Sequence, residues 1–339
     1  MSEPVSRVAP TVGATGPAPR AASGRMLVAA VLLLAAGVAV PWLVGSQLML
    51  TLMTQAVIYA ILATAIGFLI RQNGLTSFGH AAFFGLAVYL LALNGKYDLV
   101  PAEVAVLAAI ALPAALAFAA GLVIVRLPPL AFSMITLAVA QSLHELMLRW
   151  RELANGDDGM PVRLPSTLFG FGVELFQSPS TMFVVCWCAL VLVVLALAAL
   201  SRSHFGVLTV AIRENEERAR YIGYQTLVPR AVVFAISGAI GGLAGVLFAL
   251  YNAFATPGAL HWSLSGEALI MAVIGGAKAV WGPPLGAMVF FVVKDAVGDL
   301  TEHWPAIIGA TLIVVTVMLP HGLSGLVERI VRRLKDNRP

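Results

Sequence analysis

Long apolar runs dominate this sequence and leave little charge between them. Six of them approach or exceed about 20 residues: 26–44, 48–70, 102–125, 130–148, 181–200 and 230–251. A helix needs about 20 apolar residues to cross the hydrocarbon core of a bilayer. Charged residues make up only 11% of the chain, whereas a soluble domain carries about 25% because water must wet its surface. The sequence therefore predicts an all-α polytopic membrane protein.

Further apolar segments raise the predicted number of spans to about ten. The runs 78–93 and 304–319 are shorter, and the apolar stretch 267–297 is interrupted by GGAKAVWGPPLG. Glycine and proline disfavour a continuous helix there, so we expect two short helices, about 265–276 and 285–297, joined by a turn. Such broken helices occur at membrane depth where protein covers them or where they line a cavity.

The distribution of lysine and arginine predicts the orientation. With both termini in the cytoplasm and ten alternating spans, 16 of the 21 basic residues fall in cytoplasmic segments and the other 5 in external ones. The opposite orientation would invert this ratio and violate the positive-inside rule. We therefore expect an N-in, C-in protein of the inner membrane. Its parts would be a disordered Pro- and Ala-rich cytoplasmic tail at 1–25, a transmembrane domain at 26–320 and a basic cytoplasmic tail at 321–339.

The one long cytoplasmic loop, 202–229, contains the charged stretch ENEERARYIG. Two acid–base pairs have helical i,i+4 spacing, Glu214 with Arg218 and Glu216 with Arg220. Gly223 is placed to end the helix. We expect a short helix parallel to the membrane with its polar face outward, which suits docking onto a soluble partner. A solvated connecting helix is the alternative.

Several segments carry motifs in one register. Residues 74–85, GLTSFGHAAFFG, resemble the pattern G-x-x-S-x-G-H-A-A-F-F-G. Residues 217–223, ERARYIG, resemble the E-A-A-x-x-x-G loop by which ABC-importer permeases engage their ATPases. Residues 126–137 and 274–283 also resemble segments of the same family, and the matching segments occur in the family's order along the chain. Together, from about residue 48 to 325, the chain resembles the LivM-type permeases of branched-chain amino-acid ABC importers.

This resemblance implies a role and a set of partners. The ATPase-coupling residues would be Arg213, Glu214, Glu217, Arg218, Ala219 and Gly223. The partners would be a second homologous permease that completes a heterodimer, two cytoplasmic ABC ATPases, a periplasmic substrate-binding protein and the lipid bilayer. The cargo would be a branched-chain amino acid, with urea, short-chain amides or another small organic solute as alternatives.

One external loop departs from the family pattern. The family usually has L-T-G-G-x-x-G where residues 153–159 read LANGDDG, so the cargo cannot simply be carried over. Polar and glycine residues of this loop and of the third span form a candidate translocation path: Ser77, His80, Asn155, Gly156, Asp157 and Gly159. For His80 the alternative is a neutral, hydrogen-bonded packing role. Gln141, His144 and Glu145 suggest either a proton relay or, for Glu145, an ion pair with Arg149.

Four glycines of the span 230–251 predict close helix packing. Gly238 with Gly242, and Gly241 with Gly245, form two overlapping small-xxx-small pairs. Small residues let helices approach closely in lipid, where hydrophobicity provides no driving force between them.

Motifs that would support other functions are missing from the sequence. It contains no G-x-x-x-x-G-K-[ST], H-E-x-x-H or G-x-S-x-G motif and no Cys/His cluster. Cys186 and Cys188 lie inside an apolar run and are expected to pack as small apolar residues. We therefore expect no catalysis, no cofactor and no metal, and the scattered basic residues do not indicate nucleic acid. A stand-alone secondary transporter is the alternative function, but neither ionisable groups at midplane nor an internal repeat is evident.

Overall fold

The computed structural model describes residues 20–298, 306–307, 309–310, 313 and 322–336. Helices make up most of this part, with two 3-10 turns, η1 (Gly156–Asp158) and η2 (Pro257–Leu260). The α-helices are α1 (Arg20–Leu43), α2 (Gln47–Asn73), α3 (His80–Tyr97), α4 (Ala102–Ile124), α5 (Pro129–Arg149), α6 (Arg151–Ala154), α7 (Glu174–Gln177), α8 (Pro179–Arg202), α9 (His204–Glu214), α10 (Glu216–Tyr221), α11 (Leu227–Asn252), α12 (Trp262–Gly275), α13 (Gly282–Gly298) and α15 (Gly322–Asp336). Four two-residue strands form two antiparallel pairs, β1 (Met160–Pro161) with β4 (Phe254–Ala255) and β2 (Thr167–Leu168) with β3 (Phe171–Gly172).

Five of these helices, α2, α4, α5, α8 and α11, are long and apolar enough to cross a membrane. This supports the predicted all-α membrane protein. Helices α1, α3, α12 and α13 coincide with four more of the predicted spans, while the run 304–319 lies mostly outside the described residues. Helix α1 begins at Arg20, inside the segment expected to be disordered, and residues 1–19 lie outside the described part. The total of ten spans and the orientation stay predictions.

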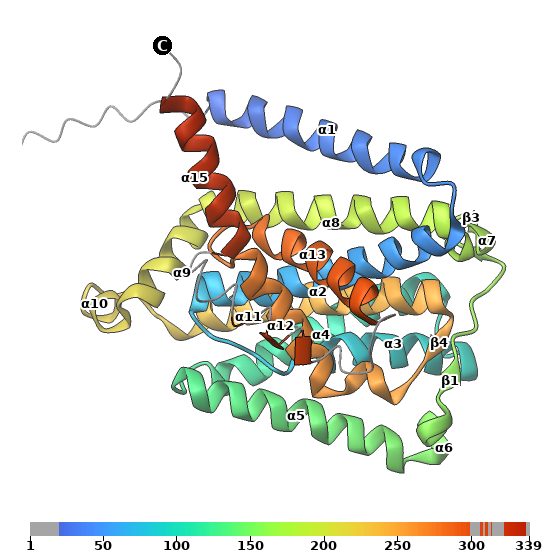
Figure 1. Ribbon diagram of the computed structural model, residues 1–339. Coiled ribbons are helices and arrows are strands. Elements are labelled where there is room, and N and C mark those ends of the chain that lie inside the picture. The colour runs from blue at the N-terminus through green and yellow to red at the C-terminus, as the bar shows by residue number, and fades with distance from the viewer. Residues whose placement is uncertain (1–19, 299–305, 308, 311–312, 314–321, 337–339) are drawn as a thin grey trace, which may run out of the picture.

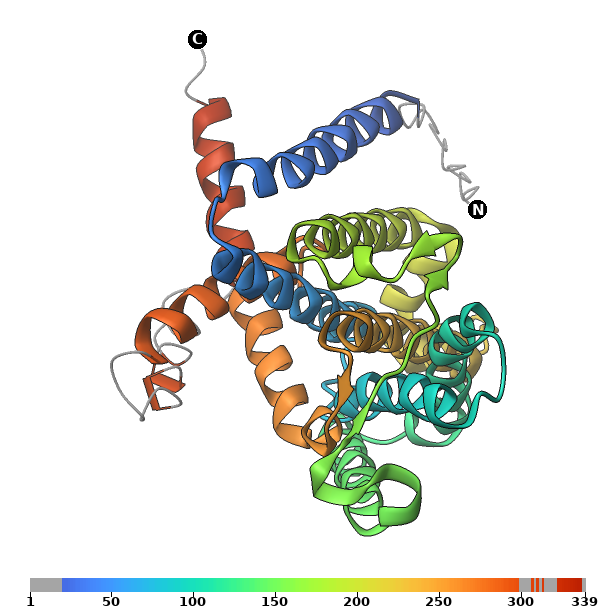
Figure 2. The ribbon, with the colours of Figure 1, turned by 90° about the vertical axis from the view of Figure 1, so that its right-hand side faces the viewer.

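The axes of α1, α2, α4, α5, α8 and α11 run side by side in one bundle (Figure 1). Helices α2 and α11 are mostly buried at its centre, whereas only 22% of the α4 span and 28% of the α5 span are buried. Seen along the bundle, α1 lies at one margin and α5 at the other (Figure 2). Local signals set the ends of α2: Ser46 Oγ accepts from Met49 N at 3.5 Å, and Gly74 ends the helix with φ +68°. Such a left-handed residue is where glycine is favoured.

The predicted broken helix pair corresponds to α12 and α13, which meet at a turn through Gly276. Gly276 has φ +92°, and a Cβ on Gly286 would overlap the Met271 carbonyl, so only glycine permits this backbone approach. An ion pair also links the two helices, with Lys294 Nζ 3.2 Å from Glu267 Oε2.

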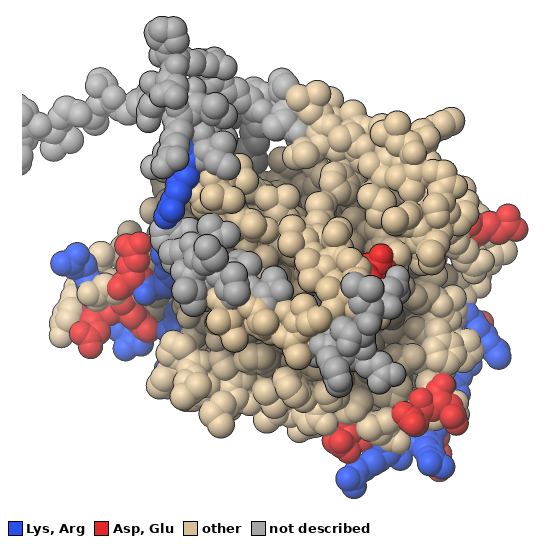
Figure 3. Space-filling model, in the orientation of Figure 1, with Lys and Arg blue, Asp and Glu red and all other residues tan. Residues whose placement is uncertain are grey.

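The two ends of the bundle differ in what they carry. Helices α9, α10 and α15 lie at one end, and α6, β1 and β4 lie at the other (Figure 1). On the face shown in Figure 3, most charged side chains gather at the two ends, and the region between them carries few charges. The predicted basic tail includes α15, and Ser324 Oγ donates to the Gly276 carbonyl at 3.3 Å. The end with α10 and α15 is the one that the charge distribution predicts to be cytoplasmic.

Candidate functional site

The loop 202–229 forms two short helices instead of the single helix that was expected. Asn215 interrupts it with an extended backbone, and its Oδ1 accepts from Arg218 N at 2.8 Å. Asn215 thereby caps α10. The predicted Glu214–Arg218 pair is wrong for this reason, because the two residues belong to different helices and Glu214 lies 3.6 Å from Arg213. The predicted pair of Glu216 with Arg220 is present at 2.6 Å.

Glu216 fastens α10 to the start of α11. Its carboxylate accepts from Arg220 at 2.6 Å, from Arg230 at 2.7 Å and from the Thr226 hydroxyl at 2.9 Å. Burial would raise the pKa of Glu216, but the Thr226 hydrogen bond and the two arginine charges outweigh it and lower that pKa below 4.5. The carboxylate therefore stays ionised at neutral pH. Sequence reasoning paired Glu216 with Arg220 but missed Thr226 and Arg230.

Polar contacts also anchor α9 to the end of α2. Thr209 Oγ1 donates to Gln72 Oε1 at 2.8 Å, and Arg213 Nη1 donates to the Arg71 carbonyl at 2.5 Å. Asn73 Nδ2 donates to the Arg230 carbonyl at 2.9 Å. The two short helices are therefore joined to both central helices, so a displacement of the loop would be transmitted to α2 and α11.

The outer side of α10 is open. Glu217 and Arg218 are exposed, Tyr221 is 90% exposed and Ile222 is 68% exposed, whereas Ala219 is buried under the helix. Gly223 ends α10 with φ +92°, and Tyr224 N donates to the Ala219 carbonyl at 3.1 Å. We call the set Glu217, Arg218, Tyr221 and Ile222 the docking face. Exposed aromatic and apolar groups beside charges are typical of surfaces that another protein covers.

Ser77 and His80 lie inside the bundle, where α2 turns into α3. His80 is completely buried, and its Nε2 lies 2.7 Å from Ser237 Oγ. Because Ser237 Oγ donates to the Ala65 carbonyl at 2.7 Å, it accepts from His80, whose Nε2 therefore carries the proton. His80 Nδ1 has no partner among the described atoms. Ser77 Oγ accepts from Gly79 N at 3.1 Å. In this conformation both residues pack within the protein.

Residues 155–159 lie at the opposite end of the bundle and form a tight turn. Asn155, Gly156 and Gly159 all have positive φ, between +63° and +66°. Asn155 Nδ2 donates to the Gly159 carbonyl at 2.8 Å, and a Cβ on Gly159 would overlap the Ala255 carbonyl. Asn tolerates the left-handed region better than other residues with a Cβ. The backbone thus explains the two glycines and the asparagine, while Asp157 is exposed beside them.

Helix α5 runs from the region of Ser77 and His80 to the end of the bundle that carries residues 155–159. Near its start, Thr136 Oγ1 accepts from Phe78 N at 3.2 Å. Near its end, His144 Nδ1 donates to the Pro257 carbonyl at 2.9 Å, and Gln141 Nε2 donates to Glu145 Oε1 at 3.3 Å. Glu145 also lies 3.6 Å from Arg149, the predicted i,i+4 pair. Sequence reasoning did not find the His261 ring, 4.9 Å from that of His144, because 117 residues separate the two.

The four glycines of α11 lie where that helix meets α3 and α4. A Cβ on Gly238 would come within 2.7 Å of Ala117 Cβ, and one on Gly242 within 3.0 Å of the Ala109 carbonyl oxygen. A Cβ on Gly245 would overlap the Phe84 carbonyl, whereas one on Gly241 would meet Phe83 Cβ at 3.4 Å. Gly238 and Gly245 therefore leave no room for a side chain, Gly242 is tightly packed, and Gly241 lies at an ordinary contact distance.

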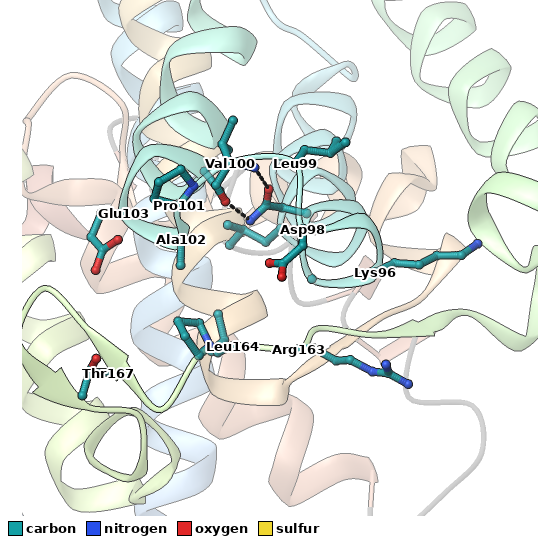
Figure 4. Close-up of a pocket in the computed structure, with 15 residues that line it drawn as sticks. Lys96, Asp98, Leu99, Val100, Pro101, Ala102, Glu103, Arg163, Leu164 and Thr167 are labelled. Atoms are coloured by element: carbon teal, nitrogen blue, oxygen red, sulfur yellow. Dashed lines mark hydrogen bonds between the residues drawn. The ribbon is translucent and has the colours of Figure 1, made fainter.

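A cavity of about 810 Å³ opens beside the turn between α3 and α4, at the end that carries residues 155–159. The Asp98 carboxylate points from this turn toward Leu164 (Figure 4). Asn94 shapes the turn by donating to and accepting from Val100, both at 3.0 Å. No group of three or more metal-ligating side chains occurs among the described residues.

Comparison with known proteins decides the family. The profile of a family described as "Branched-chain amino acid transport system / permease component" matches residues 48–316. This chain belongs to that permease family. The family consists of membrane permeases of transporters, which are not enzymes. Membership of this family, together with the apolar helices, supports a multi-pass membrane protein.

Three individual relatives share 27–28% identity with this chain. The permease protein LivM of the high-affinity branched-chain amino acid transport system of Salmonella typhimurium is 27% identical over 86% of this chain and 73% of its own length. The permease protein LsrC of the autoinducer 2 import system of Escherichia coli O9:H4 is 27% identical over 59% of this chain and 58% of its own. LivH of Salmonella typhimurium is 28% identical over 49% and 56%, respectively. No solved structure matches the chain significantly.

Proposed function

We propose that this chain is one membrane-spanning subunit of an ABC importer in the inner membrane, with ten spans and both termini in the cytoplasm. A second, homologous permease would complete the pore, two ABC ATPases would bind its cytoplasmic end, and a periplasmic binding protein would deliver the cargo. Membership of the permease family and the sequence resemblance support these partners.

The proposal rests on one observation: the docking face is exposed on one side, and the helix that carries it is attached to the central helices on the other. Glu217 and Tyr221 are exposed on α10, while Glu216 on the other side of the same helix joins it to α11 and Arg213 joins α9 to α2. A surface that is open on one side and fastened to the core helices on the other can transmit the movement of a bound protein. A mere connector needs no such attachment.

Branched-chain amino acids are the proposed cargo. Relatives named for their transport match most of the chain, which favours them over the alternatives. Another relative is named for the import of a different solute, autoinducer 2. Urea, short-chain amides and other small organic solutes are therefore the alternatives, and competition against labelled leucine during uptake would rank them.

Two variants test the docking role. Glu217→Lys reverses a charge on the docking face, and Gly223→Val forces a β-branched residue to φ +92°, which costs on the order of 1–3 kcal/mol. A Cβ at Gly223 would meet nothing within 4 Å, so this cost comes from the backbone and not from crowding. Both variants should reach the membrane in normal amounts and lose ATP-driven uptake in proteoliposomes that contain the complete transporter.

Glu174→Lys, a charge reversal on an exposed residue at the far end, is the matched control and should transport normally. A pull-down of the ATPases shows whether docking or transmission failed. Wild-type uptake and wild-type ATPase association in both variants would show that the loop is only a connector. Uptake by the isolated subunit, driven by an ion gradient without ATP, would instead establish the secondary-transporter alternative.

A further inference from the structure

A second cavity, of about 540 Å³, lies at the end of the bundle that carries α10. It opens between two turns that are far apart in sequence, the one from α4 to α5 and the one from α10 to α11. The charged residues that line it are Arg126, Arg220, Arg230 and Glu216. No motif singled out in the sequence predicted a site here, because the arginines come from three separate segments.

This cavity has an excess of positive charge. Three guanidinium groups face one carboxylate, and Glu216 is already shared between Arg220 and Arg230. Arg126 is exposed, and no hydrogen bond or ion pair joins it to the described part of the protein. A net charge of about +2 therefore remains to be balanced. Guanidinium groups bind phosphate particularly well because their N–H donors match its oxygens.

Apolar side chains also line this cavity. Val125 and Leu227 line the wall, and Val228 is 43% exposed. Val123, on α4 and three residues before Arg126, is 70% exposed. A charged floor beside an exposed apolar surface, at the level where spans end, suits a ligand that combines an anionic group with hydrocarbon chains.

The docking face lies on a different side of α10. Glu216 and Arg220 are one helical turn apart and point toward the start of α11, whereas Glu217, Arg218 and Tyr221 are turned away and exposed. The cavity and the docking face are therefore separate surfaces that share one helix.

We propose that this cavity binds the phosphate group of an anionic phospholipid, whose chains lie against Val123 and Val228. Bound there, the lipid would hold the turn after α4 against the turn after α10, and so steady the helix that carries the docking face. The inference requires that the chain lies in a membrane with α10 at the cytoplasmic leaflet, but it does not depend on the cargo or on the ATPases.

Lipid retention by the purified full-length protein tests the proposal. The protein is exchanged into nanodiscs of zwitterionic phosphatidylcholine with a small fraction of anionic phosphatidylglycerol, and the lipids that stay bound are counted by native mass spectrometry. Arg126→Gln should weaken retention of phosphatidylglycerol about fivefold, the effect of one basic residue at the membrane surface. Arg126→Lys should restore most of it. Arg163→Gln, which removes the same charge from an exposed residue at the far end, is the control and should change nothing.

Two further measurements distinguish a bound phospholipid from free phosphate and from a bound protein. Inorganic phosphate at the same concentration should not displace the lipid, and displacement would identify free phosphate as the ligand and overturn the lipid assignment. Equal phosphatidylglycerol retention by the wild type and Arg126→Gln overturns the proposal. So does an Arg126→Gln protein that loses the ATPases in a pull-down but keeps its lipid, because Arg126 would then contact a protein and not a phospholipid. Loss of transport alone does not bear on the result, since no arm measures uptake.

Discussion

At the scale of single residues, the glycines of α11 look equivalent in sequence but not in structure. The spacing pairs Gly241 with Gly245, as any small-xxx-small motif would. Within this pair, it is at Gly245 that the neighbouring helix brings a backbone carbonyl, that of Phe84, into the space of a Cβ. At Gly241 the nearest atom, Phe83 Cβ, would lie at an ordinary contact distance of 3.4 Å. The pattern identifies the packing face, whereas the depth of contact depends on the partner helix.

Alanine at these two positions should therefore have different effects on stability. Gly245→Ala must push α11 away from α3 and should destabilise the protein by about 1–3 kcal/mol. Gly241→Ala, the matched control in the same helix, should be neutral or stabilising by up to about 1 kcal/mol because alanine favours the helix. Thermal unfolding of the purified proteins in detergent measures both. Equal unfolding midpoints would show that α11 and α3 are not packed backbone to backbone.

His80 illustrates which part of a site sequence can predict. A histidine in an apolar span is conspicuous, and a hydrogen-bonded packing role was one of the two readings. Its acceptor Ser237 lies 157 residues away in the sequence, and Ser237 in turn donates to the Ala65 carbonyl. Such a partner depends on how α3 and α11 meet, which no local pattern contains. The type of residue was predictable, but its contacts were not.

At the scale of elements, α10 shows how one capping residue changes a prediction. The charged residues 214–220 satisfy helical spacing throughout, but Asn215 starts a new helix and redirects Glu216 toward Arg230. Fourteen residues and a turn separate Glu216 from Arg230, so i,i+4 spacing could not reveal that pair. The broken α12–α13 pair was predictable because glycine and proline act locally. The link between α10 and α11 was not, because it is tertiary.

Removing the Glu216 charge should loosen α10. Glu216→Gln loses both arginine ion pairs, and hydrogen bonds to charged groups contribute about 1.5–3 kcal/mol. Local opening of 216–223 should then become at least about tenfold more frequent. Hydrogen–deuterium exchange of these amides measures the opening. Glu214→Gln, whose side chain is 69% exposed, is the control and should leave the exchange unchanged. Unchanged exchange in Glu216→Gln would show that Glu216 does not hold α10 in place.

Acid should have the same effect on the wild type. The pKa of Glu216 lies below its ordinary value of 4.5, so the unfolded segment binds the proton more readily than the folded one. The stabilisation is therefore complete above about pH 4.5 and is lost as the pH falls through the pKa of the folded state. Exchange of the α10 amides, corrected for the intrinsic rate, should stay constant from pH 8 to 5 and rise only below that range. A rise near pH 6.5 would point to a histidine instead.

At the scale of the whole molecule, sequence predicts the helices better than their arrangement. Apolar runs locate the spans because each run must satisfy its own backbone hydrogen bonds in lipid. The central positions of α2 and α11 and the marginal position of α5 depend on contacts between helices, and mean apolarity does not distinguish them. The charge distribution is a global pattern that sequence reveals directly, and the charged side chains lie mainly at the two ends of the bundle in Figure 3.

The orientation of the molecule follows from that charge distribution and can be tested directly. The structure places Tyr221, 90% exposed on α10, and Asp157, exposed in the turn 155–159, at opposite ends (Figure 1). The 16-to-5 distribution of basic residues predicts that the α10 end is cytoplasmic. Tyr221→Cys and Asp157→Cys are made in a background in which Cys186 and Cys188 are replaced by alanine. A membrane-impermeant maleimide added to intact spheroplasts should label position 157 only, and both positions after lysis. Labelling of position 221 in intact spheroplasts would show that the molecule has the opposite orientation. The docking face would then lie outside the cell, where no cytoplasmic ATPase could bind it.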